Sequence, residues 1–408
     1  MTDANVALRW GQGERDRNWN GPGMRVLDGM AQRLQIGTLV IRAPDGTARR
    51  FGSGAQPKAE LSVHNPRLAF RILRRGSLGF AEGFIAGDLD TPDLEAVLRL
   101  FLVNYERLRK QFEPSRLVRA LSGIYHRLHR NTRRGSRRNI HAHYDLGNAF
   151  YGAWLDPSMT YSSAMFSDDG DLEVAQASKY RHLADLMGLH AGQHVLEVGC
   201  GWGGFAVYAA ERGCEVTALT ISEEQHAYTS ARVAAAGLAD RVNVRFQDYR
   251  DVRGTFDAIV SIEMFEAVGE AFWPVFFDRL RSLLRDDGRV GLQVITIADE
   301  YFDDYRCSVD FIQRYVFPGG MLPSPSRLRT EAERAGLSFE RKATFGPDYA
   351  QTLRLWTERF AAAWPRIQCQ SQRFDERFRR LWCYYLAYCE AGFRVGTTNV
   401  EQSVFRRA

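Results

Sequence analysis

The eleven residues His194-Val-Leu-Glu-Val-Gly-Cys-Gly-Trp-Gly-Gly204 decide the fold class of this 408-residue chain. They begin with a short apolar run, typical of a buried strand, and end in four glycines within six residues. Glycine suits a tight turn, where a Cβ would block the chain or keep the backbone away from a ligand. Further β-rich runs follow, with helical segments between most of them, at residues 215–220, 242–247, 256–262 and 289–297. Strands that alternate with helices predict right-handed βαβ units, a parallel sheet and an α/β fold.

Composition excludes several classes of protein. Hydrophobic residues make up 45% and charged residues 25% of the chain, so a disordered, collagen-like or coiled-coil protein is ruled out. No apolar run approaches the roughly 18 residues that span a bilayer, and residues 1–20 lack a signal-peptide pattern. The six cysteines show no C-x-x-C spacing, which argues against a zinc site or a disulfide framework. We therefore expect a cytoplasmic protein without a metal.

The chain before the glycine loop predicts a separate, smaller domain. Residues 34–51 alternate in polarity and are interrupted by Asp45-Gly46, which indicates a hairpin. Helical spacing follows at residues 65–75 and 93–112. We predict a small N-terminal α+β accessory domain at residues 1–115, a basic linker at 116–140, and the α/β domain at 141–408.

Positive charge is concentrated near the predicted linker. Between Tyr105 and Ile140 there are eleven Lys and Arg residues against two Glu, within a net charge of +5. A solvated linker face is one interpretation, and an anionic partner is the other. A membrane surface attracts such a segment by about 1 kcal/mol per basic side chain, and nucleic acid exerts the same kind of attraction. We expect the cluster from Arg127 to Arg138 to contribute to membrane binding.

The glycine loop itself predicts a ligand site at a helix N-terminus, where unpaired N–H groups and a partial positive charge meet. Gly199, Gly201 and Gly204 also fit the G-x-G-x-x-G pattern of dinucleotide-binding proteins, and a glycine turn without a ligand is a further alternative.

The residues around the loop favour S-adenosylmethionine (SAM) over a dinucleotide. Glu197 ends the first strand, where methyltransferases typically keep an acid that reaches the methionine amino group. The second strand ends in Thr220 without a carboxylate at its tip, unlike a ribose-binding strand. Asp248 and Tyr249 follow the third strand and suit an adenine pocket, with one polar partner and one stacking ring.

Two carboxylates follow the fourth strand at the edge of the sheet where ligands bind. Glu263 and Glu266 are spaced i, i+3, which places both on one side of a helix if one forms there. In an apolar setting their pKa values would diverge, which suits acid–base chemistry. The alternative is a pair of surface acids, against which the neighbours Met264, Phe265 and Val268 argue.

Seven sequence blocks in one order resemble the cyclopropane-fatty-acyl-phospholipid synthase family. They lie at residues 79–88, 143–148, 155–164, 195–203, 247–251, 264–266 and 315–323, so the resemblance covers nearly the whole chain. It implies a Rossmann-like SAM methyltransferase that transfers a methyl group to a cis double bond of an unsaturated phospholipid acyl chain, giving a cyclopropane fatty acid. It further implies a peripheral enzyme at the inner face of an anionic membrane, with no nucleic-acid partner, and is compatible with a homodimer.

The resemblance also assigns site residues. Positions that the family uses around SAM are matched by Tyr161, Ser162, Gly199, Gly201, Thr220, Ile221, Gln225 and Ile262. Positions that hold a bicarbonate ion, thought to take the final proton, are matched by Ser163, Glu266, Ile295, Ile297 and Tyr349.

Four positions near the expected bicarbonate depart from the family pattern. Ser163 stands where Cys is usual, Ile295 and Ala267 where His is usual, and Glu263 where Gly is common. The site has gained a carboxylate and lost two imidazoles, and charge disfavours an anion beside the added carboxylate. Our hypothesis is that Glu266, with Glu263 or a small bound anion, takes the proton.

The reaction needs aromatic surface as well as a base. An alkene has no proton to remove beforehand, and methyl transfer to it leaves a carbocation that aromatic faces can stabilise. The candidates are Tyr161, Phe265, Tyr315 and Tyr349. Because the proton acceptor differs from the family's, a methyl-branched unsaturated chain is an alternative product to the ring. Two functions compete with lipid methylation: SAM-dependent methyl transfer to a small polar metabolite or RNA, and lipid binding without catalysis.

Overall fold

The computed structural model describes residues 19, 21–109, 131–132, 135, 146–167 and 170–408. The chain divides into two compact units, Met1–Phe112 and Glu113–Ala408, and each is described by itself. Most of the expected linker, including every arginine of the Arg127–Arg138 cluster, lies outside the described residues. None of the helices in the described part of the chain has both the length and the apolar composition that crossing a bilayer requires.

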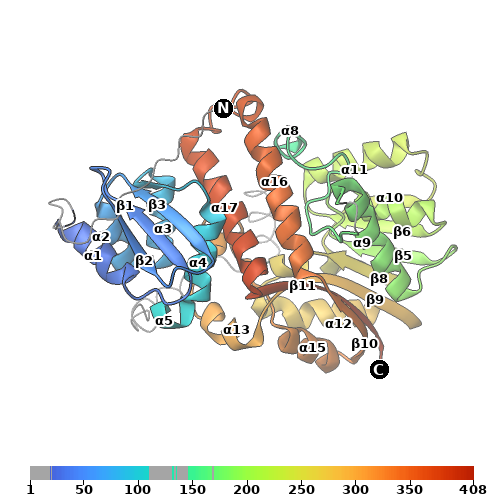
Figure 1. The fold of residues 1–408 in the computed structure, drawn as a ribbon. Helices are drawn as coiled ribbons and strands as arrows, with labels where there is room; N and C mark the ends of the chain where they lie inside the picture. The colour runs from blue at the N-terminus through green and yellow to red at the C-terminus, as the bar shows by residue number, and fades with distance from the viewer. Residues whose placement is uncertain (1–18, 20, 110–130, 133–134, 136–145, 168–169) are drawn as a thin grey trace. The chain divides into compact units, whose positions relative to one another are not determined.

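Unit 1 is built on a four-stranded sheet in the order β2-β1-β3-β4 (Figure 1). The strands are β1 (Thr38–Arg42), β2 (Ala48–Gly52), β3 (Lys58–Val63) and β4 (Leu89–Asp90). The predicted hairpin is confirmed, because β1 and β2 pair antiparallel across Asp45-Gly46. Gly46 has φ +87°, a left-handed conformation that glycine adopts without strain.

Helices complete unit 1: α1 (Pro22–Ala31), α2 (Arg67–Arg75), α3 (Ser77–Ile85), α4 (Leu94–Val103) and α5 (Tyr105–Arg109). The helix predicted at residues 93–112 is wrong as a single element, because it breaks at Asn104. The Asn104 side chain accepts hydrogen bonds from the backbone N–H groups of Gln35 and Ile36, each at 3.1 Å, and donates to Leu100 O at 2.8 Å. A side chain that competes for backbone groups in this way ends a helix.

Unit 2 contains a seven-stranded sheet in the order β10-β11-β9-β8-β5-β6-β7. Its parallel strands are β5 (His194–Val198), β6 (Glu215–Thr220), β7 (Val242–Phe246), β8 (Phe256–Ile262) and β9 (Leu284–Ile297), which confirms the five predicted runs. Strand β11 (Thr398–Arg407) pairs antiparallel with β9 on one side and with the edge strand β10 (Leu337–Thr344) on the other, and neither strand was predicted.

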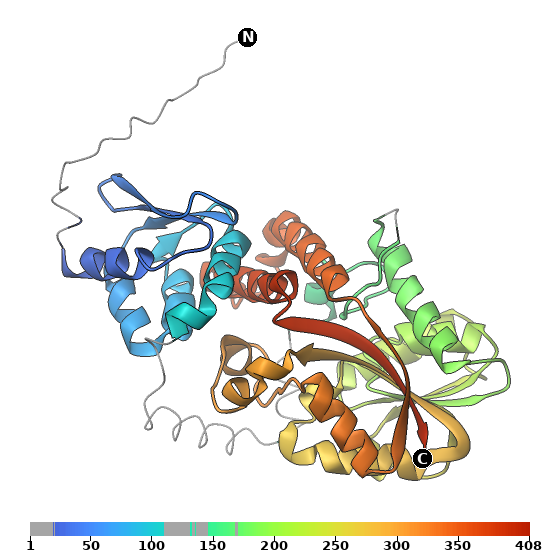
Figure 2. The same ribbon diagram turned by 60° about the horizontal axis from the view of Figure 1, so that its bottom comes forward.

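Helices cover both faces of this sheet (Figures 1 and 2). On one face pack α9 (Leu172–Met187), α10 (Gly204–Glu211) and α11 (Glu223–Ala235). On the other pack α12 (Trp273–Leu283) and α15 (Pro325–Arg334). The long helices α16 (Gly346–Ile367) and α17 (Glu376–Val395) lie side by side. The shorter elements are α8 (Asn148–Tyr151), η2 (Tyr249–Asp251), η3 (Phe265–Ala267), η4 (Glu270–Phe272), α13 (Asp299–Arg306) and α14 (Phe311–Tyr315).

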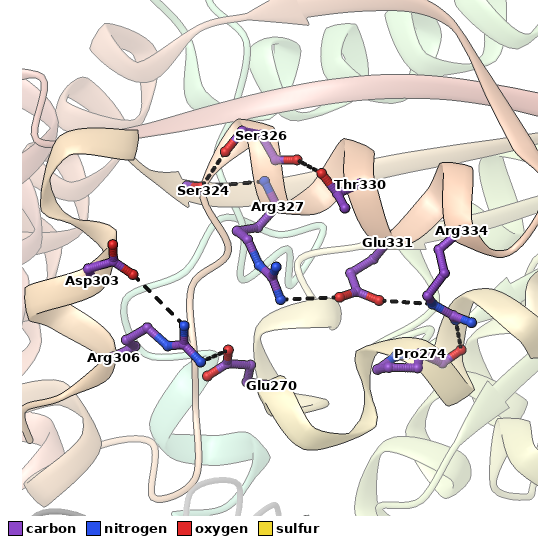
Figure 3. A network of polar contacts seen from close by, with 10 residues as sticks. All are labelled: Glu270, Pro274, Asp303, Arg306, Ser324, Ser326, Arg327, Thr330, Glu331 and Arg334. Atoms are coloured by element: carbon purple, nitrogen blue, oxygen red, sulfur yellow. Dashed lines mark hydrogen bonds and ion pairs between the residues drawn. The ribbon is translucent and has the colours of Figure 1, made fainter.

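Ion pairs tie the loop after β8 to its neighbouring helices (Figure 3). Arg306 of α13 pairs with Glu270 at 2.6 Å, which fixes the short η4 turn. Glu331 of α15 bonds Arg334 at 3.2 Å, and Arg334 in turn donates to the backbone oxygen of Pro274 at 2.8 Å. The first contact ties the segment after β8 to α13, and the second ties α15 to α12.

The strand order places a switch point at β5. The chain leaves β5 towards β6 and β7 on one side and returns to β8 and β9 on the other. In open α/β sheets such a point opens a crevice at the carboxyl ends of the strands, where ligands bind. The glycine loop follows β5, and Glu263 follows β8.

Candidate active site

The glycine loop has the shape of a ligand cradle. Gly199 and Gly201 have φ values of +86° and +52°, and Gly203 caps α10 in the same left-handed region. A Cβ on Gly199 would lie 2.6 Å from Met264 Cγ, whereas a Cβ on Gly201 would meet no atom within 4 Å. Gly199 is therefore needed for close packing, and Gly201 keeps space open above the backbone at the start of α10.

Glu197 is a buried carboxylate at the base of this loop. Its Oε2 atom has no hydrogen-bond partner among the described residues. Burial raises the pKa of Glu197 to about 8, although the Ala206 backbone N–H and the charge of Arg232 oppose the rise. An unpartnered buried oxygen is costly and suits a donor from a bound molecule, such as the amino group of SAM.

The end of β6 presents a second polar group. The Thr220 hydroxyl donates to Gln225 Oε1 at 3.0 Å and accepts from the Ser222 backbone N–H at 3.1 Å. Ile221 lies between these residues and is half-buried. Residues expected at the cofactor from this segment are thus gathered at one strand end.

Asp248 has a partner that the sequence did not indicate. Its carboxylate accepts from Arg250 Nε at 2.8 Å and from Arg250 Nη2 at 2.6 Å. Arg250 also donates to the Asn131 backbone oxygen at 3.3 Å. Tyr249 packs its ring on Phe276, with centroids 5.4 Å apart. Asp248 therefore holds the loop after β7 in place, in addition to any ligand contact.

Glu263 stands in a backbone conformation that normally requires glycine. Its φ is +48°, one of two positive values among non-glycine residues in the described part of the chain. Side-chain–backbone crowding makes this region cost about 1–2 kcal/mol for an ordinary residue. The strained backbone places a carboxylate at the end of β8, where the resembling family commonly has glycine.

Three donors converge on the Glu263 carboxylate. Oε1 accepts from the Ser163 backbone N–H and from Gln293 Nε2, each at 2.8 Å. Oε2 accepts from the Tyr349 hydroxyl at 2.8 Å. Burial raises the pKa of Glu263, and these donors together with the charge of Lys179 work against that rise.

Lys179 is a site residue that the sequence analysis missed. It is fully buried in α9, and its Nζ contacts the Ser162 hydroxyl. Burial lowers the pKa of Lys179 to about 7, while the charges of Glu263 and Asp156 raise it. One signal was present in the sequence: Ala175, Lys179 and Leu183 share the i, i+4, i+8 spacing of the buried face of α9.

Glu266 has a different environment from Glu263. Its Oε1 accepts from the Ile295 backbone N–H at 2.5 Å, and its Oε2 has no partner among the described residues. Burial and the nearby charge of Glu263 raise the pKa of Glu266 to about 8. Of the two carboxyl groups, Glu263 has the donors that stabilise an anion, whereas the raised pKa of Glu266 favours its protonated form at neutral pH.

The structure brings together the residues expected around a bicarbonate, but their donors are already used. The N–H of Ser163 and the hydroxyl of Tyr349 both bond Glu263. The Ser163 hydroxyl donates to Ala164 O at 2.9 Å, and the N–H of Ile295 bonds Glu266. The N–H of Ile297 donates to Pro323 O at 3.0 Å. A separate small anion does not fit this donor set.

A row of aromatic side chains runs from Tyr161, one of the expected cofactor residues, to Tyr349, which bonds the Glu263 carboxylate. Tyr161 donates to or accepts from the Tyr385 hydroxyl at 2.7 Å and lies with its ring centroid 5.3 Å from that of Trp356. The Trp356 centroid is 6.1 Å from that of Tyr349. The hypothesis for Phe265 is wrong, because core rings of α12 enclose it; those of Trp273, Phe276 and Phe277 lie within 5.4 Å. Tyr315 lies in α14, half-buried, with its ring 5.4 Å from Phe311.

The residues present fit SAM. The open cradle at Gly201, the unpartnered oxygen of Glu197 and the polar end of β6 offer an acceptor for an ammonium and a helix N-terminus for a carboxylate. Ile262 ends β8, and the buried Ser162 hydroxyl contacts Lys179 Nζ. No group of three or more potential metal ligands occurs within the described ranges.

Comparisons with known proteins agree with this geometry. The family model for mycolic acid cyclopropane synthetase matches residues 131–403. The tuberculostearic acid methyltransferase of Mycobacterium tuberculosis is 41% identical over 372 residues, covering 88% of this chain and 85% of that protein. The cyclopropane-fatty-acyl-phospholipid synthase of Escherichia coli K12 is 36% identical over 363 residues, covering 87% and 89%.

A solved structure supports the fold and the cofactor. The mycolic acid cyclopropane synthase CmaA1, complexed with SAH and CTAB, superposes with a TM-score of 0.62 at 31% identity. The match covers 66% of this chain and 98% of that one. From its fold, its glycine loop and these relatives, the chain is a SAM-dependent methyltransferase that belongs to the mycolic acid cyclopropane synthetase family.

Proposed function

We propose that this enzyme transfers a methyl group from SAM to a cis double bond of a phospholipid acyl chain, with the Glu263 carboxylate as the proton acceptor. The observation that carries the proposal is the position of that carboxylate. It accepts from the Ser163 N–H and the Tyr349 hydroxyl, which belong to two of the five residues that the family resemblance assigns to bicarbonate. The enzyme thus supplies its own anion.

SAM supplies an electrophilic methyl: a C–C bond forms to one alkene carbon while the S–C bond breaks and leaves its electron pair on sulphur. The other alkene carbon then carries a positive charge. The rings of Tyr161, Trp356 and Tyr349 offer faces to this charge, worth about 0.5–2 kcal/mol each when desolvated. Their burial also excludes water, which would otherwise add to the cation.

The proton that leaves the cation passes to a Glu263 oxygen. A base works when it is ionised; burial raises the pKa of Glu263, and its three donors and the Lys179 charge work against that rise. Glu266 is the poorer acceptor, because its pKa of about 8 keeps it mostly protonated at pH 7. This assignment reverses the emphasis of our sequence-based hypothesis, in which Glu266 came first.

We propose a methyl-branched unsaturated chain as the product. If the proton leaves a carbon next to the cation, a new double bond forms; if it leaves the added methyl, a cyclopropane closes. The changed proton acceptor and the 41% identity to a tuberculostearic acid methyltransferase support the branched product. The ring is the second candidate, which the relative named as a cyclopropane synthase supports.

The share of this chain that each relative covers favours a phospholipid substrate. The phospholipid synthase aligns with 87% of this chain, whereas the mycolic acid enzyme covers 66%, and the family model begins at residue 131. Unit 1 is therefore the part that separates this chain from the mycolic acid enzyme. We propose that the reaction takes place at the cytoplasmic face of a membrane.

The test combines purified enzyme, methyl-labelled SAM and vesicles of a monounsaturated phospholipid. NMR of the extracted lipid should show new alkene signals and no high-field cyclopropane protons. Glu263→Gln should lower kcat at least 100-fold, within the range that a positioned base contributes. Glu266→Gln, which resembles the protonated carboxyl, should keep more than a tenth of the rate, and Glu270→Gln is the matched control outside the site.

A second experiment tests whether the reaction depends on bicarbonate. Removing dissolved carbon dioxide should leave the wild-type rate unchanged. Glu263→Gly suits the φ of +48° and vacates the donors, so its lost rate should return on adding bicarbonate or formate. A wild-type rate that depends on bicarbonate, or Glu263→Gln at full rate, would overturn the proposal.

A further inference from the structure

We infer that the outer face of α2 in unit 1 is a docking surface for an anionic phospholipid bilayer. This face comprises Arg67, Phe70, Arg71, Leu73, Arg74 and Arg75 and is called the α2 face below. The inference deepens the proposed function by naming where the enzyme meets its substrate's membrane.

The α2 face exposes large apolar side chains. Phe70 is 51% exposed and Leu73 is 50% exposed, among the highest values for large hydrophobic residues in the described chain. Their i, i+3 spacing places them next to each other on the helix. The opposite side of α2 buries Leu68 and Ala69, so the helix has one apolar side in the core of unit 1 and a second in solvent.

Arginines surround these two side chains. Four of the nine residues of α2 are Arg and none is acidic. Arg71 pairs with Asp88 at 2.8 Å, and Arg75 pairs with Glu82. Arg67 and Arg74 have no ion-pair partner among the described residues. The α2 face therefore keeps excess positive charge beside its exposed apolar groups.

The helix is held firmly enough to present this face. A Cβ on Gly79 of α3 would lie 2.0 Å from the backbone oxygen of Arg71, and one on Gly83 would lie 2.5 Å from Leu68 Cδ1. The two glycines thus let α3 pack against α2 at backbone distance. Phe70 and Leu73 point away from this contact, since both are exposed.

A bilayer is the occupant that uses both features. An acidic protein or a nucleic acid would pair with Arg67 and Arg74, but its charged groups would offer no apolar surface for Phe70 and Leu73 to contact. At a membrane the apolar side chains reach the acyl boundary, while arginines remain among anionic headgroups with their stems in the apolar layer. A short amphipathic contact of this kind gives reversible binding.

Vesicle binding tests the inference without turnover, so its failure is distinct from a failure of the proposed function. The full chain is sedimented with vesicles of phosphatidylcholine alone or with phosphatidylglycerol. Arg67→Gln with Arg74→Gln should weaken partitioning to the anionic vesicles about 30-fold, since each basic side chain adds about 1 kcal/mol and 1.4 kcal/mol is tenfold. Phe70→Gln with Leu73→Gln should weaken it at least tenfold on the same vesicles.

Val275→Gln is the matched control, because Val275 is also an exposed apolar residue, on α12 of unit 2, and its loss should leave binding unchanged. All variants should keep wild-type rates on a detergent-dispersed unsaturated phospholipid and lose rate only on vesicles. Equal vesicle binding by wild type and both double variants overturns the inference. So does a change of oligomeric state in the double variants by sedimentation velocity, which would assign the α2 face to a second copy of the chain.

Discussion

Replacing Glu266 by glutamine should remove a pH dependence of stability that the wild-type protein carries. The fully buried carboxyl has a pKa of about 8 in the folded chain, against about 4.5 in the unfolded chain. Between these values the folded state keeps a proton that the unfolded state releases, so the free energy of unfolding falls as pH rises. The stabilising contribution is complete below pH 4.5 and is lost as pH passes 8.

The size of the effect follows from the same two values. Each pH unit in this window changes the free energy of unfolding by up to about 1.4 kcal/mol, so wild type should lose about 3 kcal/mol relative to Glu266→Gln between pH 5 and pH 8. Glutamine copies the shape of the protonated carboxyl and can accept the same Ile295 N–H bond. The comparison is made without SAM or lipid, because either could change the burial of Glu266.

Urea unfolding followed by tryptophan fluorescence measures the difference, since six of the eight tryptophans lie in unit 2. Glu270→Gln is the control: it removes a carboxylate from the same segment, one that pairs with Arg306 instead of being enclosed. It should follow the wild-type pH profile. If wild type and Glu266→Gln keep a constant difference from pH 5 to pH 8, the burial argument is refuted and with it our reason for preferring Glu263 as the base.

Three further substitutions test neighbouring parts of the site. Lys179→Met removes the charge that lowers the pKa of Glu263, so the acid limb of the kcat–pH profile should shift to a pH about one unit higher. An acid limb at the wild-type pH would count against an electrostatic interaction between Lys179 and Glu263. Tyr349→Phe removes one of three donors to Glu263 and should lower kcat about tenfold while SAM affinity by calorimetry stays unchanged. Gly199→Ala places a Cβ 2.6 Å from Met264 Cγ at a φ of +86°, so SAM should bind at least tenfold more weakly in the same titration; wild-type affinity would show that the loop does not need this packing.

Local patterns explain which parts of the fold the sequence could predict. Strands β5 to β9 and the glycine loop were readable because apolar runs and glycine spacing are properties of neighbouring residues. Strands β10 and β11 were not, because they depend on pairing between residues far apart in the chain, such as Leu337 with Arg407, which are 70 positions apart. The single helix expected at 93–112 failed at Asn104, whose side chain finds backbone partners nearly 70 positions away.

The candidate site shows the same division. The family resemblance located Ser163, Glu266 and Tyr349, and both the i, i+3 spacing to Glu266 and the departure from the family's glycine singled out Glu263. Lys179 was missed because a lysine on a helix normally indicates a solvated position, and its partner Ser162 approaches only through tertiary packing. The pairing of Asp248 with Arg250 was also missed, although the two are close in sequence, because polar residues beside a strand end were assigned to the ligand alone.

The left-handed backbone at Glu263 has a genetic consequence. Glycine codons GGA and GGG differ from the glutamate codons GAA and GAG only in the middle base. A main chain already shaped for glycine therefore lets one point mutation convert an enzyme dependent on dissolved inorganic carbon into one with a tethered carboxylate, or the reverse, while the strand end stays where it is. By our proposal, the carboxylate tethered at this position makes the methyltransferase independent of the cell's carbon dioxide supply.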